Sequence, residues 1–452
     1  MKLVTTLAAA VVAVLAASTS LAAQDSHYWT MQYGPRPSLL GGAVIGSVDD
    51  VSASYYNPGA LGLAQDLAFA VSTNVFEYSL VRLEDGGGEG VDLGTSKSGI
   101  RPSLVAGSIT RDLFGGGTVA YSVLTRMRGS QDLAGYAILT ADEIDPDLGL
   151  EDAAGLVSFE GEFNEIWAGL SYARPLGSHL SLGMSWYGAF RSQDRARETI
   201  SEAVDTARVG SASLDMAAGK YYSVRTLLKV GAFGQFGAVT VGATVTTPSL
   251  HITGSGELGL NRGVFRPDTT ALAATIQTDL AAEFKSPLSV GFGGAVRLGN
   301  TRLHASAEWF DAIAPYVVIQ GEEFVTQEPE VIWTPAPMQQ LDEVFNWGAG
   351  LEHAFSTRFS VYASYYTDKS GLTDKLTDPT PSLSILPIDI NTVTAGSDFV
   401  IGSARFTLGV GYGWGKKLDR NLTDALKGED EEFEATFVYR NIRLIFGFEI
   451  GI

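Results

Sequence analysis

Residues 301–310 read TRLHASAEWF, and their side chains alternate between apolar and polar. Leu303, Ala305, Ala307 and Trp309 are apolar, whereas the residues between them are polar or charged. A period of two is typical of a β-strand with one apolar and one polar face. The same alternation recurs at residues 288–298, 345–351, 359–365, 406–414 and 442–450. The pattern therefore predicts an all-β protein whose strands each present one face to an apolar environment.

About 14 strands are predicted, and the connections between them alternate in length. Short connections such as 175–177 and 298–300 separate long ones such as 128–162 and 249–285. A β-sandwich also alternates its side chains but does not sort its loops in this way. We therefore expect a transmembrane antiparallel β-barrel with both termini on the rim of short turns. The predicted strands lie near residues 66–80, 102–111, 117–127, 163–174, 179–191, 220–234, 237–248, 286–298, 300–311, 344–355, 357–367, 389–402, 404–415 and 433–450.

The composition fits a closed barrel. The 452 residues include no cysteine, so disulfides cannot stabilise the fold. In hydrocarbon every backbone polar group must be paired, and a sheet achieves this by closing on itself. The formal net charge of -20 argues against nucleic acid as a partner, because phosphate binding needs a basic surface. We expect a monomer surrounded by outer-membrane lipid and lipopolysaccharide, with an interfacial belt that includes Trp167, Trp186, Trp309, Trp347 and Trp414.

The N-terminus combines a secretory leader with a segment that precedes the barrel. A basic start, an apolar run over 3–17 and small residues at 20–23 predict a signal peptide over residues 1–23. A barrel of about 14 strands is too wide to be filled by its own side chains. Residues 24–64 show no strand periodicity, and we expect them to plug the lumen. Residues 65–452 would then form the barrel and its long extracellular loops.

Within the predicted plug, residues 49–63 read DDVSASYYNPGALGL. Its Asn57-Pro58-Gly59 tripeptide is a strong turn former, because asparagine bonds to nearby backbone, proline fixes φ and glycine accepts a positive φ. Together with the GGA at 41–43, this stretch resembles the N-terminal signature of the FadL/TodX-type outer-membrane transporters of long-chain fatty acids and other hydrophobic compounds. Gly59 stands where that family has alanine, a change expected to loosen the turn.

The resemblance extends along the chain through residues 285–293 and 347–352. It implies that extracellular loops catch an apolar molecule, which passes to a site inside the barrel and leaves sideways into the membrane when the hatch shifts. Asp49, Asp50, Asn57, Pro58 and Gly59 would belong to that hatch. The two acids are expected to accept hydrogen bonds from arginines on the polar faces of strands, namely Arg297, Arg302, Arg405 or Arg443.

Two long connections carry apolar residues at helical spacing. One set is Leu272, Ile276, Leu280 and Phe284, and a shorter set is Ile200, Ala203, Val204 and Ala207. Both predict helices with one apolar face. The first set provides candidate ligand-capturing residues, although each helix could equally pack its apolar face onto the rim of the barrel.

No catalytic residue, metal site or cofactor is predicted. The five histidines, His27, His179, His251, His304 and His353, lack the spacing of metal ligands. A barrel hydrolase would need a serine beside a histidine, and a pairing that involves His304 or His353 stays open. Two other functions also stay open. The barrel could act as a shuttle or anchor for secreted proteins, or it could be a general porin with an open polar lumen.

Overall fold

The computed structural model of the chain describes residues 27–64, 69–85, 92–113, 116–141, 151–205, 210–266, 269–372, 388–423 and 432–450. The predicted signal peptide lies outside these residues. No helix in the described part of the chain is long and apolar enough to cross a bilayer.

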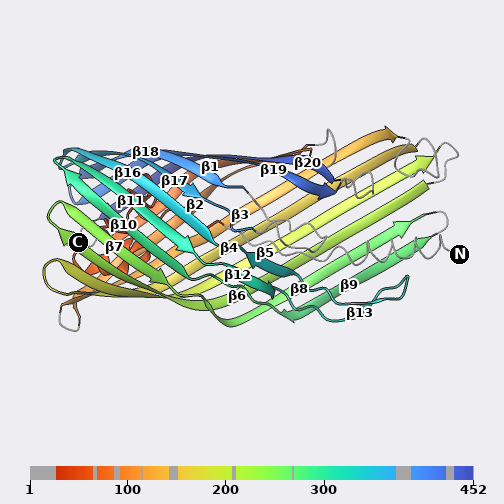
Figure 1. Cartoon of the computed structure of the whole chain (residues 1–452), viewed down its shortest axis with the longest axis horizontal. Coiled ribbons are helices and arrows are strands. Elements are labelled where there is room, and N and C mark those ends of the chain that lie inside the picture. Colours follow the sequence, from red (N-terminus) through yellow and green to blue (C-terminus); the bar gives the residue numbers. More distant parts are fainter. Residues whose placement is uncertain are drawn as a thin grey trace.

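The described residues form a closed antiparallel barrel of 14 strands, as the sequence predicts (Figure 1). The ring closes where β1 pairs with β20, and each of the 14 predicted strands corresponds to one strand of the ring. In order around the ring these are β1 (Phe69–Glu84), β2 (Leu93–Leu113), β3 (Gly117–Ala141), β4 (Glu151–Pro175), β5 (Leu180–Asp205), β6 (Gly210–Phe236), β7 (Val239–Thr246), β10 (Ser289–Leu298), β11 (Thr301–Phe310), β16 (Val344–Ser356), β17 (Phe359–Asp368), β18 (Ile390–Ile401), β19 (Ala404–Thr423) and β20 (Glu432–Ile450).

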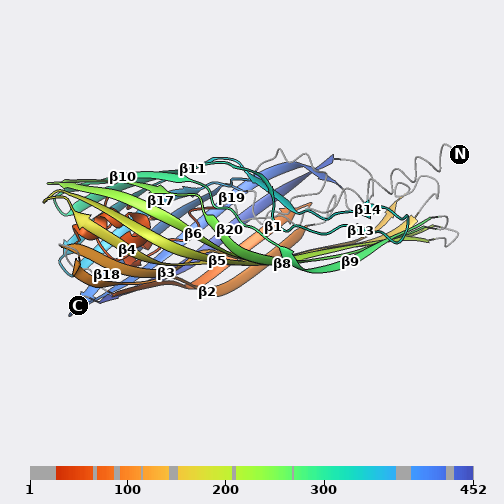
Figure 2. The same ribbon diagram turned by 90° about the horizontal axis from the view of Figure 1, so that it is seen from below.

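The wall is much taller on one side than on the other. Strands β3 to β6 have 25, 25, 26 and 27 residues, whereas β10 and β11 have 10 each. Figures 1 and 2 show these long strands continuing together beyond the rest of the ring as a one-sided sheet. The predicted loops at 128–162 and 192–219 are therefore mostly strand. The sequence pattern missed these extensions because no bilayer covers them and both of their faces carry polar residues.

The helices predicted in the long connections are strands in the structure, so that interpretation was wrong. β8 (Leu250–Phe265) pairs with the outer half of β6, and β9 (Thr270–Ala281) pairs with β8. Ile200 and Val204 lie in β5, and Ala207 lies outside the described residues. A spacing of four residues marks one face of a helix, but it is also twice the strand period. The spacing therefore could not distinguish the two structures.

The connection between β11 and β16 folds back over the outer end of the barrel. It contains β12 (Ile313–Val317) paired with β15 (Met338–Leu341), and β13 (Phe324–Val325) paired with β14 (Ile332–Trp333). Backbone bonds join it to the free edge of β9, where the nitrogen of Leu272 donates to the oxygen of Glu328 at 2.7 Å. The connection thereby covers a sheet edge that would otherwise be open to pairing.

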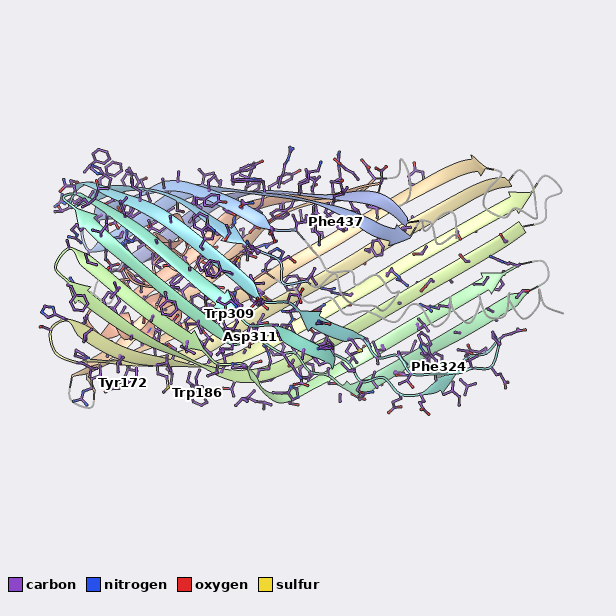
Figure 3. All side chains as sticks on the ribbon, in the orientation of Figure 1. Tyr172, Trp186, Trp309, Asp311, Phe324 and Phe437 are labelled. Atoms are coloured by element: carbon purple, nitrogen blue, oxygen red, sulfur yellow. The ribbon has the colours of Figure 1, made fainter. Side chains whose placement is uncertain are left out.

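The outer face of the ring carries a belt of exposed apolar side chains (Figure 3). On β5 this belt runs from Leu180 to Phe190 and includes Trp186, which is 59% exposed. That length matches the roughly 9–11 residues of a membrane-spanning strand. Trp347 and Trp414 also face outward. Trp167 does not, because it is buried in the lumen against Tyr187, so its expected place in the belt was wrong.

Candidate functional site

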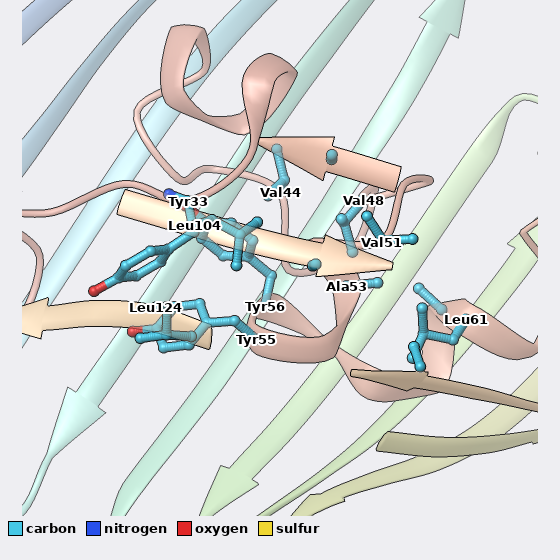
Figure 4. Packing of buried hydrophobic residues seen from close by; sticks show 14 of the residues in the cluster. Tyr33, Val44, Val48, Val51, Ala53, Tyr55, Tyr56, Leu61, Leu104 and Leu124 are labelled. Carbon is cyan, nitrogen blue, oxygen red and sulfur yellow. The ribbon is translucent and has the colours of Figure 1, made fainter. Parts of the chain in front are cut away.

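Residues 27–64, called the N-terminal segment below, occupy the inside of the ring. The segment contains α2 (Pro35–Leu39), α3 (Ala53–Tyr56) and the 3-10 helix η1 (Pro58–Gly62). Helix α2 packs on β17 to β20 and β1, whereas η1 packs on β4, β5 and β6. These strands lie on opposite sides of the ring, so the segment spans the lumen. Figure 4 shows its side chains packed against Leu104 of β2 and Leu124 of β3.

The first described residues are held by a carboxylate at the end of β17. Asp368 accepts hydrogen bonds from the backbone nitrogens of Tyr28 at 3.0 Å and Trp29 at 2.8 Å, and from the Thr30 hydroxyl at 2.5 Å. The indole of Trp29 donates to Glu308 of β11 at 3.0 Å. Bonds to a buried carboxylate are among the stronger hydrogen bonds in proteins. The start of the N-terminal segment is therefore fixed to two strands of the wall, β17 and β11.

The Asn-Pro-Gly turn lies against β6. The amide of Asn57 donates to the carbonyl oxygens of Ile45 at 2.9 Å and Ala232 at 3.0 Å, and its side-chain oxygen accepts from the nitrogen of Gly59 at 3.1 Å. Asn57 is completely buried, and Pro58 begins η1. Asparagine thus bonds to its own turn as expected, and it also ties that turn to the wall.

Gly59 is needed for a different reason from the one predicted. Its φ is not positive, so the turn does not use the conformation that only glycine adopts easily. A Cβ atom at Gly59 would instead lie 2.7 Å from the carbonyl oxygen of Gly231 in β6. Because the two backbones touch, glycine at this position allows the close approach and does not merely loosen the turn.

Inward-facing glycines of the wall let the N-terminal segment approach the strand backbones closely. A Cβ at Gly231 would lie 2.9 Å from Pro58 and closer still to Asn57. Gly293 of β10 faces Gly46 in the same way, where a Cβ would lie 2.8 Å from the Gly46 nitrogen. These wall glycines were not identified from the sequence. A glycine at an inward position of a strand could have identified them. Glycine there weakens the strand, so its presence indicates that another backbone approaches closely.

Replacing Gly231 by valine should displace the turn and open the lumen. A branched side chain there would overlap Asn57 and Pro58, so we expect higher conductance of the purified barrel in planar bilayers. Gly188→Val on β5 is the matched control, because Gly188 faces outward and a Cβ there meets nothing closer than 3.9 Å. Equal conductance in the two variants would show that the wall glycines do not seat the segment.

The two acids of the segment have different partners. Asp49 pairs with Arg302 of β11 at 3.4 Å, one of the four arginines expected, and with Arg36 of α2 at 3.0 Å. Asp50 is buried and accepts bonds from the backbone nitrogen and hydroxyl of Ser52, and none of the described wall arginines pairs with it.

The other three arginines have separate roles. Arg443 of β20 does bind the segment, but through the carbonyl oxygen of Thr30 at 2.7 Å. Arg405 pairs with Asp398 at 3.1 Å, and Arg297 is exposed near the rim.

A polar cluster joins the segment to β11 and β16. Arg36 donates to Glu352 at 2.6 Å, Glu352 lies 3.3 Å from His304, and the other ring nitrogen of His304 lies 2.8 Å from the Ser47 hydroxyl. His353 is not part of the cluster and bonds to Thr301. Ser47 is completely buried, and Arg36 already occupies Glu352. The cluster therefore attaches the segment to the wall and leaves the serine no room for a substrate.

Arg36 was missed by the sequence reading, although it is the one Arg, Lys, Asp or Glu residue between positions 26 and 48. A single charge in an otherwise uncharged stretch that enters a lumen needs a buried partner, and this is the signal that could have identified it.

The space between the segment and the wall is small. A cavity of about 10 Å3, enough for about one water molecule, lies among Tyr28, Trp29, Tyr55, Lys229 and Glu308. The ammonium of Lys229 lies 3.8 Å from Glu308 and 4.8 Å from the centre of the Tyr55 ring. One basic and one acidic group of the wall thus line this cavity.

On the side of the cavity that faces the long extensions of β3 to β6, the lumen contains two clusters of apolar side chains. One cluster surrounds Phe163, Phe284, Phe310 and Tyr316, and a second surrounds Leu93, Val157 and Tyr439. Phe284 lies between the guanidinium groups of Arg191 and Arg225, 4.1 and 4.3 Å from its ring centre. Both arginines pair with Glu165, at 3.2 and 2.8 Å, and all three charged side chains are fully buried.

The four candidate capturing residues do not share one face. Leu280 and Phe284 are buried, Leu272 is half-buried, and Ile276 is 84% exposed. A register shift in β9 next to Asp279, which has a positive φ of 58°, turns Leu280 to the face opposite Ile276. Only Leu280 and Phe284 therefore belong to the lumen cluster.

The wall has a gap in its hydrogen-bond ladder between β2 and β3. These strands pair at Gly94↔Ala134 and from Leu104↔Leu124 onward, and no ladder pair joins the described residues 95–103 and 125–133. Side chains bridge the gap instead: Arg101 donates to the carbonyl of Arg128 at 3.0 Å, and Lys97 donates to Ser130 at 2.6 Å. The gap begins beside Ile166, at the upper edge of the apolar belt.

The N-terminal segment contacts one end of this gap from inside, at Arg126. Arg126 sits at a register shift of β3, and its carbonyl oxygen accepts from the Tyr33 hydroxyl at 3.1 Å. Its guanidinium donates to the carbonyl oxygen of Tyr28 at 2.8 Å. Arg126 therefore links the position of the segment directly to the strand that borders the gap.

Comparison by sequence identifies no relative: no protein-family model and no curated protein matches the chain. Comparison by structure does. A FadL homologue of Pseudomonas aeruginosa superposes with a TM-score of 0.58 at 11% identity, over 94% of this chain and 99% of that one. The chain has the FadL/TodX-type fold. The resemblance seen in the sequence is confirmed at that level.

Two toluene transporters show the same FadL/TodX-type fold. TodX of Pseudomonas putida gives a TM-score of 0.58 at 12% identity, over 93% of this chain and 99% of that one. TbuX of Ralstonia pickettii gives 0.54 at 10% identity, over 93% and 98%. Each match covers nearly the whole of both chains.

Proposed function

We propose that this protein is an outer-membrane channel for the uptake of hydrophobic small molecules, with the N-terminal segment as its plug. The observation that carries the proposal is a closed barrel with an apolar belt outside, apolar clusters in the upper lumen and a buried segment below them. A hydrophobic molecule gains free energy in such a lumen, whereas a sugar or an ion would lose its hydration. The similar toluene transporters support this reading.

The ladder gap is the proposed exit. Unpaired backbone in contact with lipid is costly, so an interrupted ladder at the edge of the belt calls for a function. Arg126 connects the gap to the plug, and a shift of the plug would free the Arg126 carbonyl and loosen β3. In this scheme one part of the plug must keep its position until a ligand arrives. That part consists of Asp49, Asp50, Asn57, Pro58 and Gly59.

The charges in the lumen favour a ligand with a carboxylate, such as a long-chain fatty acid. On the described parts of β3, β5 and β6 the buried charged side chains are all basic: Arg126, Arg191, Arg195, Arg225 and Lys229. Glu165 of β4 and Glu308 of β11 oppose them. A ligand carboxylate would add a further negative charge beside Lys229 when the cavity opens.

Two other functions have less support. A general porin needs an open polar lumen, which the buried segment and its small cavity do not provide. A shuttle or anchor for secreted proteins would need no apolar clusters inside the barrel. The ring closes within one chain, which supports a monomer.

Uptake of labelled compounds tests the function. Cells that lack the gene should take up labelled oleate more slowly, while their uptake of glucose stays unchanged. In Lys229→Met, oleate uptake should fall roughly fivefold or more, because the ligand loses a charged partner worth at least 1 kcal/mol, while toluene uptake should be unaffected. Unchanged uptake of both oleate and toluene in the deletion strain would refute the channel. A parallel fall of oleate and toluene in Lys229→Met would refute only the preference for carboxylates.

A further inference from the structure

The outer face of the tall wall has a hollow of about 290 Å3 above the apolar belt. It is built from outward residues of four strands, β4, β5, β6 and β8, that lie opposite one another in the ladder. Ladder partners form two neighbouring rows: Glu162, Asp194, Lys220 and Glu257 in one, and Ser192, Tyr222 and Ser255 in the other. The hollow is therefore a property of sheet register and does not depend on a loop.

Small residues explain why the wall is hollowed here. On β5, β6 and β8 the next row away from the belt consists of Ala196, Ala218 and Gly259, and only its member on β4, Glu160, is large. The three small residues cover little of the sheet, so the strand backbones form a flat floor. Met216 follows one row further and is 39% exposed, which closes the hollow on that side.

The hollow lies at the level of lipid head groups. The last apolar row of the belt is Ile166, Phe190 and Val224, directly below the row that contains Tyr222. On β5 the outward apolar residues from Leu180 to Phe190 already span the length of a membrane strand. With the long strands directed outward, the hollow faces the head-group layer of the outer leaflet.

The chemistry of the hollow suits a sugar. The ring of Tyr222 is 42% exposed and stacks on Phe190 with ring centres 6.3 Å apart, so it offers a fixed aromatic face. The negative face of such a ring attracts the C–H groups of a pyranose. Glu162, Asp194 and Glu257 only accept hydrogen bonds when ionised, which matches the hydroxyl donors of a sugar. Three carboxylates beside one ammonium disfavour a phosphate.

We propose that this hollow binds a sugar ring of an outer-leaflet glycolipid. The site is outside the lumen and separate from the transport path, so the proposal does not rest on what the channel carries. A bound glycolipid would fix the tall wall to the membrane surface at the base of β4 to β6 and β8. The volume of the hollow is close to the lower end of the roughly 300–1,000 Å3 typical of small-ligand sites.

Native mass spectrometry of the delipidated full-length barrel, in a detergent that has no sugar group, tests the site, with an uncharged monoglucosyl diacylglycerol as the probe. We expect saturable binding of one molecule, and a roughly tenfold weaker Kd in Tyr222→Ala, the effect of losing one aromatic contact of about 1.4 kcal/mol. Glu257→Gln should weaken binding in the same direction, because an amide is a poorer acceptor than a carboxylate.

Tyr412→Ala is the matched control, because Tyr412 is an outward tyrosine of β19 with 40% exposure, far around the ring from the hollow. Both tyrosine variants should keep their heat-modifiable band on gels, which shows that the barrel folds. Equal loss of binding in Tyr222→Ala and Tyr412→Ala would overturn the proposal, because it would mean binding to the apolar belt in general. Equally strong binding of phosphatidylglycerol at the same site would also overturn it.

Discussion

Asn57→Ala should reduce uptake of labelled oleate at least about fivefold while the barrel still assembles. The substitution leaves the carbonyl of Ile45 and the nitrogen of Gly59 without this partner in a buried place, and it removes the bond to the Ala232 carbonyl of β6. Each unpaired buried group costs about 1–3 kcal/mol, and one such loss already changes a two-state population severalfold. We expect the plug to lose its fixed position, with leakage of small hydrophilic solutes as the second readout.

Asn300→Ala provides the control for Asn57→Ala. Asn300 is an exposed asparagine in the turn between β10 and β11, where substitutions usually change stability by less than about 0.5 kcal/mol. Both variants should remain heat-modifiable on gels. If Asn57→Ala behaves like Asn300→Ala in uptake and in leakage, the turn only shapes the chain and does not govern the plug.

Glu165→Gln should have the largest effect on stability. Glu165 is the shared partner of Arg191 and Arg225, and it also accepts from the indole of Trp167 at 2.6 Å. Removal of its charge takes away the carboxylate that both fully buried guanidinium groups share, a loss of about 3–5 kcal/mol for a buried ion pair. Urea unfolding in detergent should show a free energy of unfolding lower by that amount.

Glu160→Gln is the control on the same strand, because Glu160 points outward and is exposed. It should change the free energy of unfolding by less than about 0.5 kcal/mol. An equal change in the two variants would mean that the buried arginines are compensated by other groups in the lumen. In that case the rings of Phe163 and Phe284, which lie over these arginines, are the next residues to replace.

The barrel itself was predictable because it depends on a repeated local pattern. β11 and residues 442–450 of β20 alternate in this way, so each residue there added to the signal for an apolar outer face. The sorted connection lengths then required an up-and-down ring. The extensions of β3 to β6 and the hairpin β8–β9 were not predictable in this way, because in water neither face must be apolar and a spacing of four fits both a strand and a helix.

The site was only partly predictable. The turn at Asn57 and the pair Asp49–Arg302 follow from residue chemistry, because a buried turn needs its backbone bonds satisfied and an acid attracts a nearby cation. Arg36, the wall glycines and the link from Arg126 to Tyr33 depend on which strand faces which part of the segment. Such contacts join residues up to several hundred positions apart in the chain.

The sequence by itself determined a closed barrel, the rim on which its short turns lie and a segment that had to find a place inside. Only the tertiary structure decided where that segment sits, which wall residues hold it and where the ladder between β2 and β3 is interrupted. The physical reason is the range of the forces involved. Strand alternation is imposed at each residue by the apolar surroundings, whereas the contacts in the lumen exist only after the ring has closed and set the register of every strand.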